Sequence, residues 1–211
     1  MKKQLFWLFL ALLVVCAVAA FWWLGTRTQR HLRFSNTDVE VVENDIDVVY
    51  GSDSARITIY MFVSYTCRHC RECLMTDLPQ IQQRYIDNGT VRFVVKPINI
   101  AENHDMMSAL QLAGCMNRDG NADDIRELLL TDPNAIYSDE FRQLIDDIIN
   151  TNPELAECLV ADNFSSVKQN NQLFSAIGSK VTPIFVVGSH VYKGRRSFDN
   201  FSEIIEYELN K

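Results

Sequence analysis

The sequence predicts an α/β domain in which a β-α-β unit and a β-β-α unit are separated by an all-helical segment. Two β-rich runs, 57–63 and 91–95, flank a stretch with helical periodicity, which is the order of a β-α-β unit. Two shorter β-rich runs, 184–187 and 190–192, follow a long region of helical periodicity. The 211 residues, of which 47% are hydrophobic, suffice for one such domain and an N-terminal extension.

The N-terminus is apolar or small and uncharged from Leu5 to Leu24, and two lysines precede this run. A helix of about 20 residues crosses the ~30 Å hydrocarbon core of a bilayer, so this segment is predicted to be a signal anchor. A cleaved signal peptide is the alternative, because Ala17-Val18-Ala19 fits the small-x-small cleavage pattern. The run exceeds the usual apolar region of a signal peptide, about 7–15 residues, which favours the anchor.

Charge is distributed unevenly along the chain. Of the 20 Lys and Arg residues, five lie in the first 33 residues, where there is no acid. The remaining 178 residues therefore carry 15 basic and 27 acidic side chains, a net charge of −12. A surface this acidic repels phosphate backbones, so nucleic-acid binding is not expected.

The segment before the first buried strand contains an alternating stretch. Val39 and Val41 alternate with acidic residues, which predicts an edge strand after a polar stalk. The predicted division of the chain is a signal anchor or signal peptide at 1–24, stalk and edge strand at 25–50, the first part of the α/β domain at 51–101, a helical insertion at 102–178 and the second part at 179–211.

The first strand, 57–63, leads into a helix whose apolar positions recur at intervals of three and four. Pro79 is expected to bend this helix and Gly89 to follow its end. The next strand, 91–95, should pair with the first in parallel through a right-handed crossover.

Residues typical of helix ends and turns occur in the helical insertion and in the segment that follows it. Ser138 is positioned to cap a helix, and Gly178 to end the last helix of the insertion. Gly188 occupies the first turn position of a predicted type II′ hairpin. A closing helix is predicted at 199–209.

Cys67 and Cys70 form a Cys-x-x-Cys motif at the junction of a buried strand and a helix, which predicts redox chemistry. This spacing brings the two sulfurs within bonding reach and leaves the first at the helix N-terminus. The unpaired N–H groups there favour its thiolate, and Arg68 and protonated His69 add positive charge. Stabilising the thiolate favours the reduced pair, so the disulfide should be a good oxidant.

At this point the chain resembles the DsbA-type thiol:disulfide oxidoreductases, which have a thioredoxin fold with a helical insertion. The resemblance covers about residues 45–209. It rests on three motifs, Phe62-Val63-Ser64-Tyr65, Cys67-Arg68-His69-Cys70 and Val181-Thr182-Pro183. One position departs from the family pattern, because many members carry Pro where this chain has Arg68.

The resemblance implies a role for each matched residue. Cys67 would be the sulfur that clients attack, Cys70 its buried partner, and His69 the residue that tunes them. Pro183 would be a cis-proline facing the cysteines, and an extended client would bind beside Thr182, Pro183 and Arg68.

The resemblance also implies partners and a location. The clients would be reduced exported polypeptides in the periplasm, and a DsbB-type membrane protein would reoxidise the enzyme. The chain would be attached to the bacterial inner membrane by its N-terminal segment. No metal and no cofactor apart from the redox-active disulfide are expected.

Several alternatives stay open at this point. The same fold could serve a disulfide isomerase or a reductase restricted to certain clients. Cys73 extends the motif to Cys-x-x-Cys-x-x-Cys, so together with His69 it could belong to a metal-binding module, although packing in the core is favoured. Cys115 and Cys158 are either a structural disulfide or two separate buried thiols.

Overall fold

The computed structural model describes residues 4, 10, 12–22, 32–118 and 122–211. Its contacts divide the chain into two units, Met1–Arg33 and Phe34–Lys211. In the first unit, residues 12–22 are helical and exposed, and the rest of the predicted span falls largely outside the described residues. Within the described part of the chain, no helix combines the length and the apolar character needed to cross a membrane.

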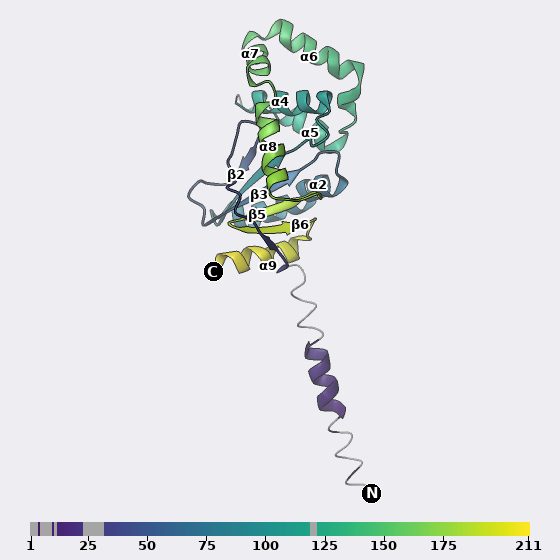
Figure 1. The fold of residues 1–211 in the computed structure, drawn as a ribbon, viewed down its shortest axis with the longest axis vertical. Helices are drawn as coiled ribbons and strands as arrows, with labels where there is room; N and C mark the ends of the chain where they lie inside the picture. Colours follow the sequence, from purple (N-terminus) through teal and green to yellow (C-terminus); the bar gives the residue numbers. More distant parts are fainter. Residues whose placement is uncertain (1–3, 5–9, 11, 23–31, 119–121) are drawn as a thin grey trace. The chain divides into compact units, whose positions relative to one another are not determined.

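The second unit is built on a six-stranded mixed sheet (Figure 1). The strand order is β1-β6-β5-β3-β4-β2, in which β3 and β4 are parallel and every other neighbouring pair is antiparallel. The predicted parallel β-α-β unit is therefore confirmed. The strands are β1 Ser35–Asn36, β2 Val48–Tyr50, β3 Ile57–Val63, β4 Val91–Pro97, β5 Ile184–Val187 and β6 His190–Lys193.

The connection between β3 and β4 is helical from residue 68 to residue 86. The predicted apolar face is buried, but the helix includes two π-helical segments in addition to α-helical turns. Gly89, whose φ of 74° suits glycine, follows its end as expected. The segments are α2 Arg68–Glu72, η2 Cys73–Asp77, α3 Leu78–Ile81 and η3 Gln82–Ile86.

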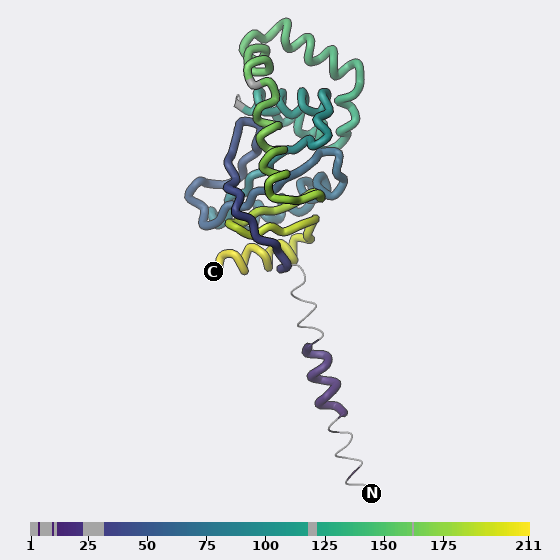
Figure 2. The backbone as a smooth tube through the Cα atoms, in the orientation of Figure 1, coloured from purple at the N-terminus to yellow at the C-terminus, as the bar shows by residue number. Residues whose placement is uncertain are grey.

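The helical insertion packs around an apolar core that includes Leu110, Leu112 and Leu129, together with Ile46 and Tyr65 from outside the insertion. Ser138 caps α6 as predicted, because its hydroxyl accepts a hydrogen bond from the Phe141 N–H at 3.1 Å. The tube in Figure 2 shows α8 running from the insertion back to the sheet. The helices are α4 His104–Arg118, α5 Asp123–Thr131, the 3₁₀ turn η4 Ala135–Tyr137, α6 Asp139–Thr151, α7 Pro153–Asp162 and α8 Ser165–Ala176.

The last helix, α9 Phe198–Leu209, covers one face of the sheet. Its Phe201 ring packs edge-on against Phe185 of β5, with 4.6 Å between ring centroids, and near Phe93 of β4. Gly188 has a φ of 56° in the turn between β5 and β6, where the sequence predicts a turn that needs glycine.

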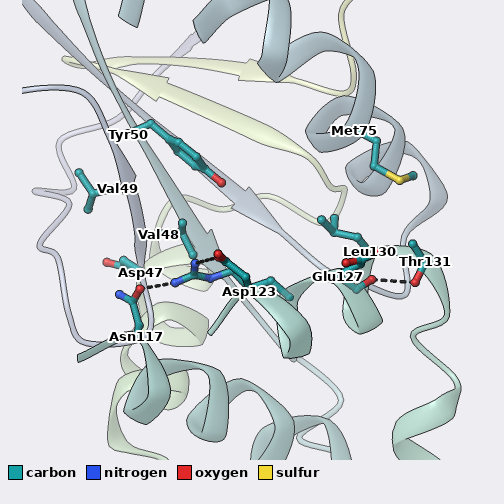
Figure 3. Close-up of a pocket in the computed structure, with 11 residues that line it drawn as sticks. Asp47, Val48, Val49, Tyr50, Met75, Asn117, Asp123, Glu127, Leu130 and Thr131 are labelled. Atoms are coloured by element: carbon teal, nitrogen blue, oxygen red, sulfur yellow. Dashed lines mark hydrogen bonds and ion pairs between the residues drawn. The ribbon is translucent and has the colours of Figure 1, made fainter. Parts of the chain in front are cut away.

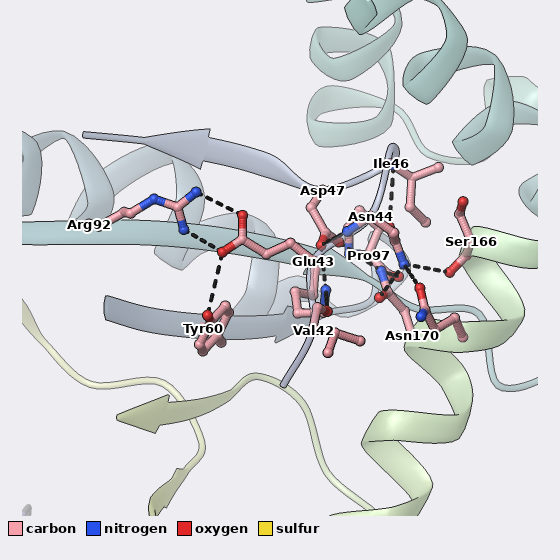
Figure 4. A network of polar contacts seen from close by, with 12 residues as sticks. Val42, Glu43, Asn44, Ile46, Asp47, Tyr60, Arg92, Pro97, Ser166 and Asn170 are labelled. Atoms are coloured by element: carbon pink, nitrogen blue, oxygen red, sulfur yellow. Dashed lines mark hydrogen bonds and ion pairs between the residues drawn. The ribbon is translucent and has the colours of Figure 1, made fainter. Parts of the chain in front are cut away.

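The predicted edge strand around Val39 and Val41 is wrong, because residues 37–44 form no strand. This segment is held by side chains instead (Figure 4). Glu43 forms an ion pair with Arg92 of β4, and the Val42 carbonyl accepts a hydrogen bond from Lys96 Nζ at 2.8 Å. The edges of the sheet are β1 and β2, which are two and three residues long.

Candidate active site

Cys67 lies at the N-cap of α2, after a short turn that follows β3. Its carbonyl accepts hydrogen bonds from the Cys70 and Arg71 N–H groups at 3.0 and 3.2 Å. Its side chain is half-buried, whereas that of Cys70, one turn further along the helix, is fully buried. One sulfur of the pair is therefore within reach of another molecule and the other is not.

The loop before β5 brings the predicted substrate-binding residues to the same place. The peptide bond between Thr182 and Pro183 is cis, and the Cys67 sulfur lies 3.5 Å from the Thr182 carbonyl oxygen. The Pro183 carbonyl accepts a hydrogen bond from the Gly194 N–H at 2.8 Å, which ties this loop to the end of β6. Residues 115 positions apart in the sequence thus face each other.

The two cysteines differ in acidity. Burial raises the pKa of Cys67, but hydrogen bonds from the Thr182 side chain and from the Cys70 and His69 backbone outweigh it and hold the pKa below the ordinary thiol value. For Cys70, burial dominates and raises the pKa to about 12. At neutral pH the negative charge of a reduced pair belongs on Cys67.

Arg68 and His69 are exposed, and each contacts the Glu72 carboxylate, at 2.7 Å from Arg68 Nε and 3.5 Å from His69 Nδ1. Sequence reasoning placed their positive charge beside Cys67 and missed this acid. The i,i+4 spacing of Arg68 and Glu72 is a signal that could have revealed it. Arg195, which reaches Glu72 at 3.3 Å from 123 residues away, left no such signal.

Cys73 is buried in η2, and burial holds its pKa above the ordinary thiol value. His69 lies on the exposed side of the same helix. Over the described ranges, no group of three or more His, Cys, Asp or Glu side chains is arranged to hold a metal ion. The structure therefore does not bring the proposed metal ligands together.

Two cavities lie near this helix. One of about 410 Å³ borders the cis-proline loop, and its lining includes Thr66, Ile98, Phe174 and Thr182. The other, of about 540 Å³, lies between β2 and α5 (Figure 3). The first is the one that borders the redox pair, because its lining includes Thr182, whose carbonyl oxygen lies 3.5 Å from the Cys67 sulfur.

Cys115 and Cys158 are joined in a disulfide that links α4 to α7. The disulfide closes a loop of 43 residues within the helical insertion. The structure thus separates a bonded pair in the insertion from the free thiols of Cys67 and Cys70.

The sequence profile of the thioredoxin family matches residues 43–207. Among curated relatives, a Rickettsia conorii protein named as a protein-disulfide oxidoreductase is 27% identical over 194 residues, 89% of this chain and 69% of that protein. The disulfide bond formation protein D of Bacillus subtilis is 27% identical over 169 residues, 76% of this chain and 76% of that protein.

Solved structures share the fold. The Wolbachia pipientis α-DsbA1 crystal structure is similar with a TM-score of 0.63 at 16% identity, over 81% of this chain and 94% of that one. The oxidised BdbD of Bacillus subtilis also has a TM-score of 0.63, at 22% identity, over 84% of this chain and 100% of that one. These similarities confirm the predicted α/β fold with its helical insertion.

Proposed function

Because the chain belongs to the thioredoxin family, among its DsbA-like disulfide oxidoreductases, we propose that it is a thiol oxidase that donates a Cys67–Cys70 disulfide to reduced polypeptides. The observation that carries the proposal is the difference between the two sulfurs. Cys67 is accessible and held below the ordinary thiol pKa, whereas Cys70 is buried and held above it.

The reaction needs two exchanges. In the first, a client thiolate attacks the Cys67 sulfur, the Cys67–Cys70 bond breaks, and Cys70 takes up a proton as a thiol. In the second, another client thiolate attacks the client sulfur of this mixed disulfide and Cys67 leaves as a thiolate. The client gains a disulfide and the enzyme gains two electrons. A low pKa makes Cys67 a good leaving group, which favours the second exchange.

The cis-proline loop is the proposed client site. The Thr182 carbonyl lies 3.5 Å from the Cys67 sulfur, so an extended client segment beside Thr182 and Pro183 would bring its cysteine to the reacting atom. Backbone hydrogen bonds of this kind do not depend on the client sequence. Arg68, whose side chain is 82% exposed beside the pair, is placed to contact the same client.

The reoxidation partner and the location are further parts of the proposal. A reduced pair must lose its two electrons to a membrane protein of the DsbB type before another turnover. The apolar N-terminal run supports attachment to the inner membrane, and the periplasmic placement of the α/β domain rests on the resemblance to the DsbA-type family. Fractionation of cells after an alkaline wash tests this, since a released full-length chain would contradict attachment.

The activity test is direct. The oxidised protein is mixed with a reduced unfolded substrate, and substrate disulfides are counted after acid quench and alkylation. Cys67→Ser should abolish oxidation. Cys73→Ala should retain it, because Cys73 is buried in the core and takes no part in the exchange. Loss of activity in Cys73→Ala, together with stoichiometric bound metal in the parent protein, would favour the metal-binding alternative.

The isomerase and the client-restricted reductase alternatives predict a different redox state of Cys67 and Cys70 in cells. An oxidase keeps Cys67 and Cys70 mostly oxidised at steady state, whereas the two alternatives need them mostly reduced. Rapid acid trapping followed by gel-shift alkylation of the four free cysteines reads this state. A mostly reduced pair in growing cells would overturn the oxidase assignment and leave the fold assignment intact.

A further inference from the structure

Glu72, the last residue of α2, contacts two arginines and one histidine. Its carboxylate lies 2.7 Å from Arg68 Nε, 3.5 Å from His69 Nδ1 and 3.3 Å from Arg195 Nη1. Arg68 and His69 are the two residues between the cysteines of the motif. The charge of Arg68, which follows Cys67 in the sequence, is therefore paired with an acid outside the motif.

Arg195 comes from the loop between β6 and α9 and is held firmly. It contacts both carboxylate oxygens of Asp77, at 2.7 Å from Nε and 3.3 Å from Nη2, and the Thr76 hydroxyl at 3.0 Å. The preceding residue, Gly194, donates its N–H to the Pro183 carbonyl. The loop that fixes the cis-proline thus also fixes Arg195.

These contacts contribute little to stability. The side chains of Arg68 and His69 are 82% and 69% exposed, and ion pairs in such positions are screened by water and salt. Hydrogen bonding to Arg68 is the main cause that holds the pKa of Glu72 below its ordinary value, so this carboxylate is charged at neutral pH. Its effect on its surroundings is therefore mainly electrostatic.

We propose that Glu72 is a positioning residue that limits the oxidising power of the Cys67–Cys70 pair by neutralising Arg68, the residue that follows Cys67. This inference rests on the proposed function, since it names what regulates the same site. With Glu72 charged, Arg68 favours a thiolate at Cys67 less than it would alone. Without Glu72 the charge of Arg68 is uncompensated, whereas Arg195 stays paired with Asp77, so the thiolate is more stable and the disulfide is reduced more easily.

The test measures the acidity of Cys67 in the full-length reduced protein. The rate of alkylation of Cys67 is followed against pH in the parent, Glu72→Gln, Glu72→Asp and Glu157→Gln, the last a control at an exposed acid of α7. In Glu72→Gln the thiolate-to-thiol ratio should rise by a factor of about two to five, the range for one charge near a helix end. The effect should shrink in 1 M salt, where the Debye length is about 3 Å.

The matched variants separate charge from structure. Glu72→Asp keeps the charge and should stay close to the parent, and Glu157→Gln should not differ from it. An unchanged or raised Cys67 pKa in Glu72→Gln would overturn the proposal. Because the readout needs no client, a protein that fails to oxidise clients but shows the Glu72→Gln shift would refute the proposed function alone.

Discussion

Cys67 and Cys70 are three residues apart and have opposite acid–base surroundings. Hydrogen bonds from Thr182, Cys70 and His69 outweigh the burial of Cys67 and lower its pKa, whereas the burial of Cys70 outweighs its hydrogen bonds with Thr182 and Ser64. A thiolate at the first position and a thiol at the second are what a disulfide donor needs once it has been reduced. This difference affects how stability depends on pH.

The stability of the reduced protein should depend on pH in two phases. Cys67 has a lowered folded pKa, so the free energy of unfolding rises with pH from that pKa up to the unfolded thiol value of about 8.5. Cys70 has a raised folded pKa, so the same free energy falls from about 8.5 toward about 12. Urea titrations of reduced and oxidised protein check this, because the oxidised pair does not titrate. A difference between the two forms that is flat from neutral pH to pH about 8.5 would contradict the assignment.

Thr182 supplies the largest of the hydrogen-bond contributions that lower the Cys67 pKa. Thr182→Val keeps the shape and the carbonyl but removes the hydroxyl, so the Cys67 pKa should rise by about one unit, the size of one hydrogen bond to a charged group. The pH profile of alkylation measures the shift. Thr151→Val, on an exposed part of α6, is the matched control and should leave the profile unchanged.

At the scale of elements, a buried ion pair joins the segment before β2 to the sheet. Lys96 of β4 and Asp47 are in contact, with side chains 0% and 1% exposed. Asp47 also accepts a hydrogen bond from Asn170 of α8 at 2.9 Å, and Asn44 donates to the Ser166 carbonyl at 3.1 Å (Figure 4). This network connects the end of the segment to the sheet and to the insertion without strand pairing in residues 37–44.

Removing one partner of this pair leaves a buried charge without compensation. Lys96→Met should lower the free energy of unfolding by about 3–5 kcal/mol. Chemical denaturation measures the loss. The double variant Lys96→Met/Asp47→Asn should lose less than the sum of the single variants, since neither charge then remains. Additive losses would mean that the two side chains act independently.

The Cys115–Cys158 disulfide constrains the insertion, since it connects α4 to α7 across 43 residues. Replacing both cysteines with Ala should cost up to about 4 kcal/mol of stability, the loop-entropy value for that length. Denaturation without reductant, in a Cys67→Ser/Cys70→Ser background, isolates this effect from the redox pair. A loss below about 1 kcal/mol would show that the insertion does not need this constraint.

At the scale of the whole molecule, local patterns predicted the parts of the fold that are long or strongly periodic. Strands 57–63 and 91–95 are mostly apolar, β-rich runs, and the cap at Ser138 is a local hydrogen bond, so these features were predictable. The edges of the sheet were not, because strands of two and three residues carry no periodicity.

The active site also has features that the sequence predicted and features that it did not. The cysteines and their place at a helix start follow from adjacent residues, and the placement of Thr182 and Pro183 came from the family resemblance. The contact of Arg195 with Glu72 could not be predicted from the sequence, because the two residues are 123 positions apart and only the fold brings them together. Long-range charge pairs such as Arg195 with Glu72 and Asp77 leave no trace in local sequence patterns.

The most direct test of the account is the equilibrium of the Cys67–Cys70 pair with glutathione redox buffers, which gives its reduction potential. If the surroundings favour the Cys67 thiolate as described, the potential should be less negative than the ~−230 to −200 mV of glutaredoxins. A potential as negative as that of thioredoxin, about −270 mV, would mean that the pair keeps its disulfide and does not give it to clients.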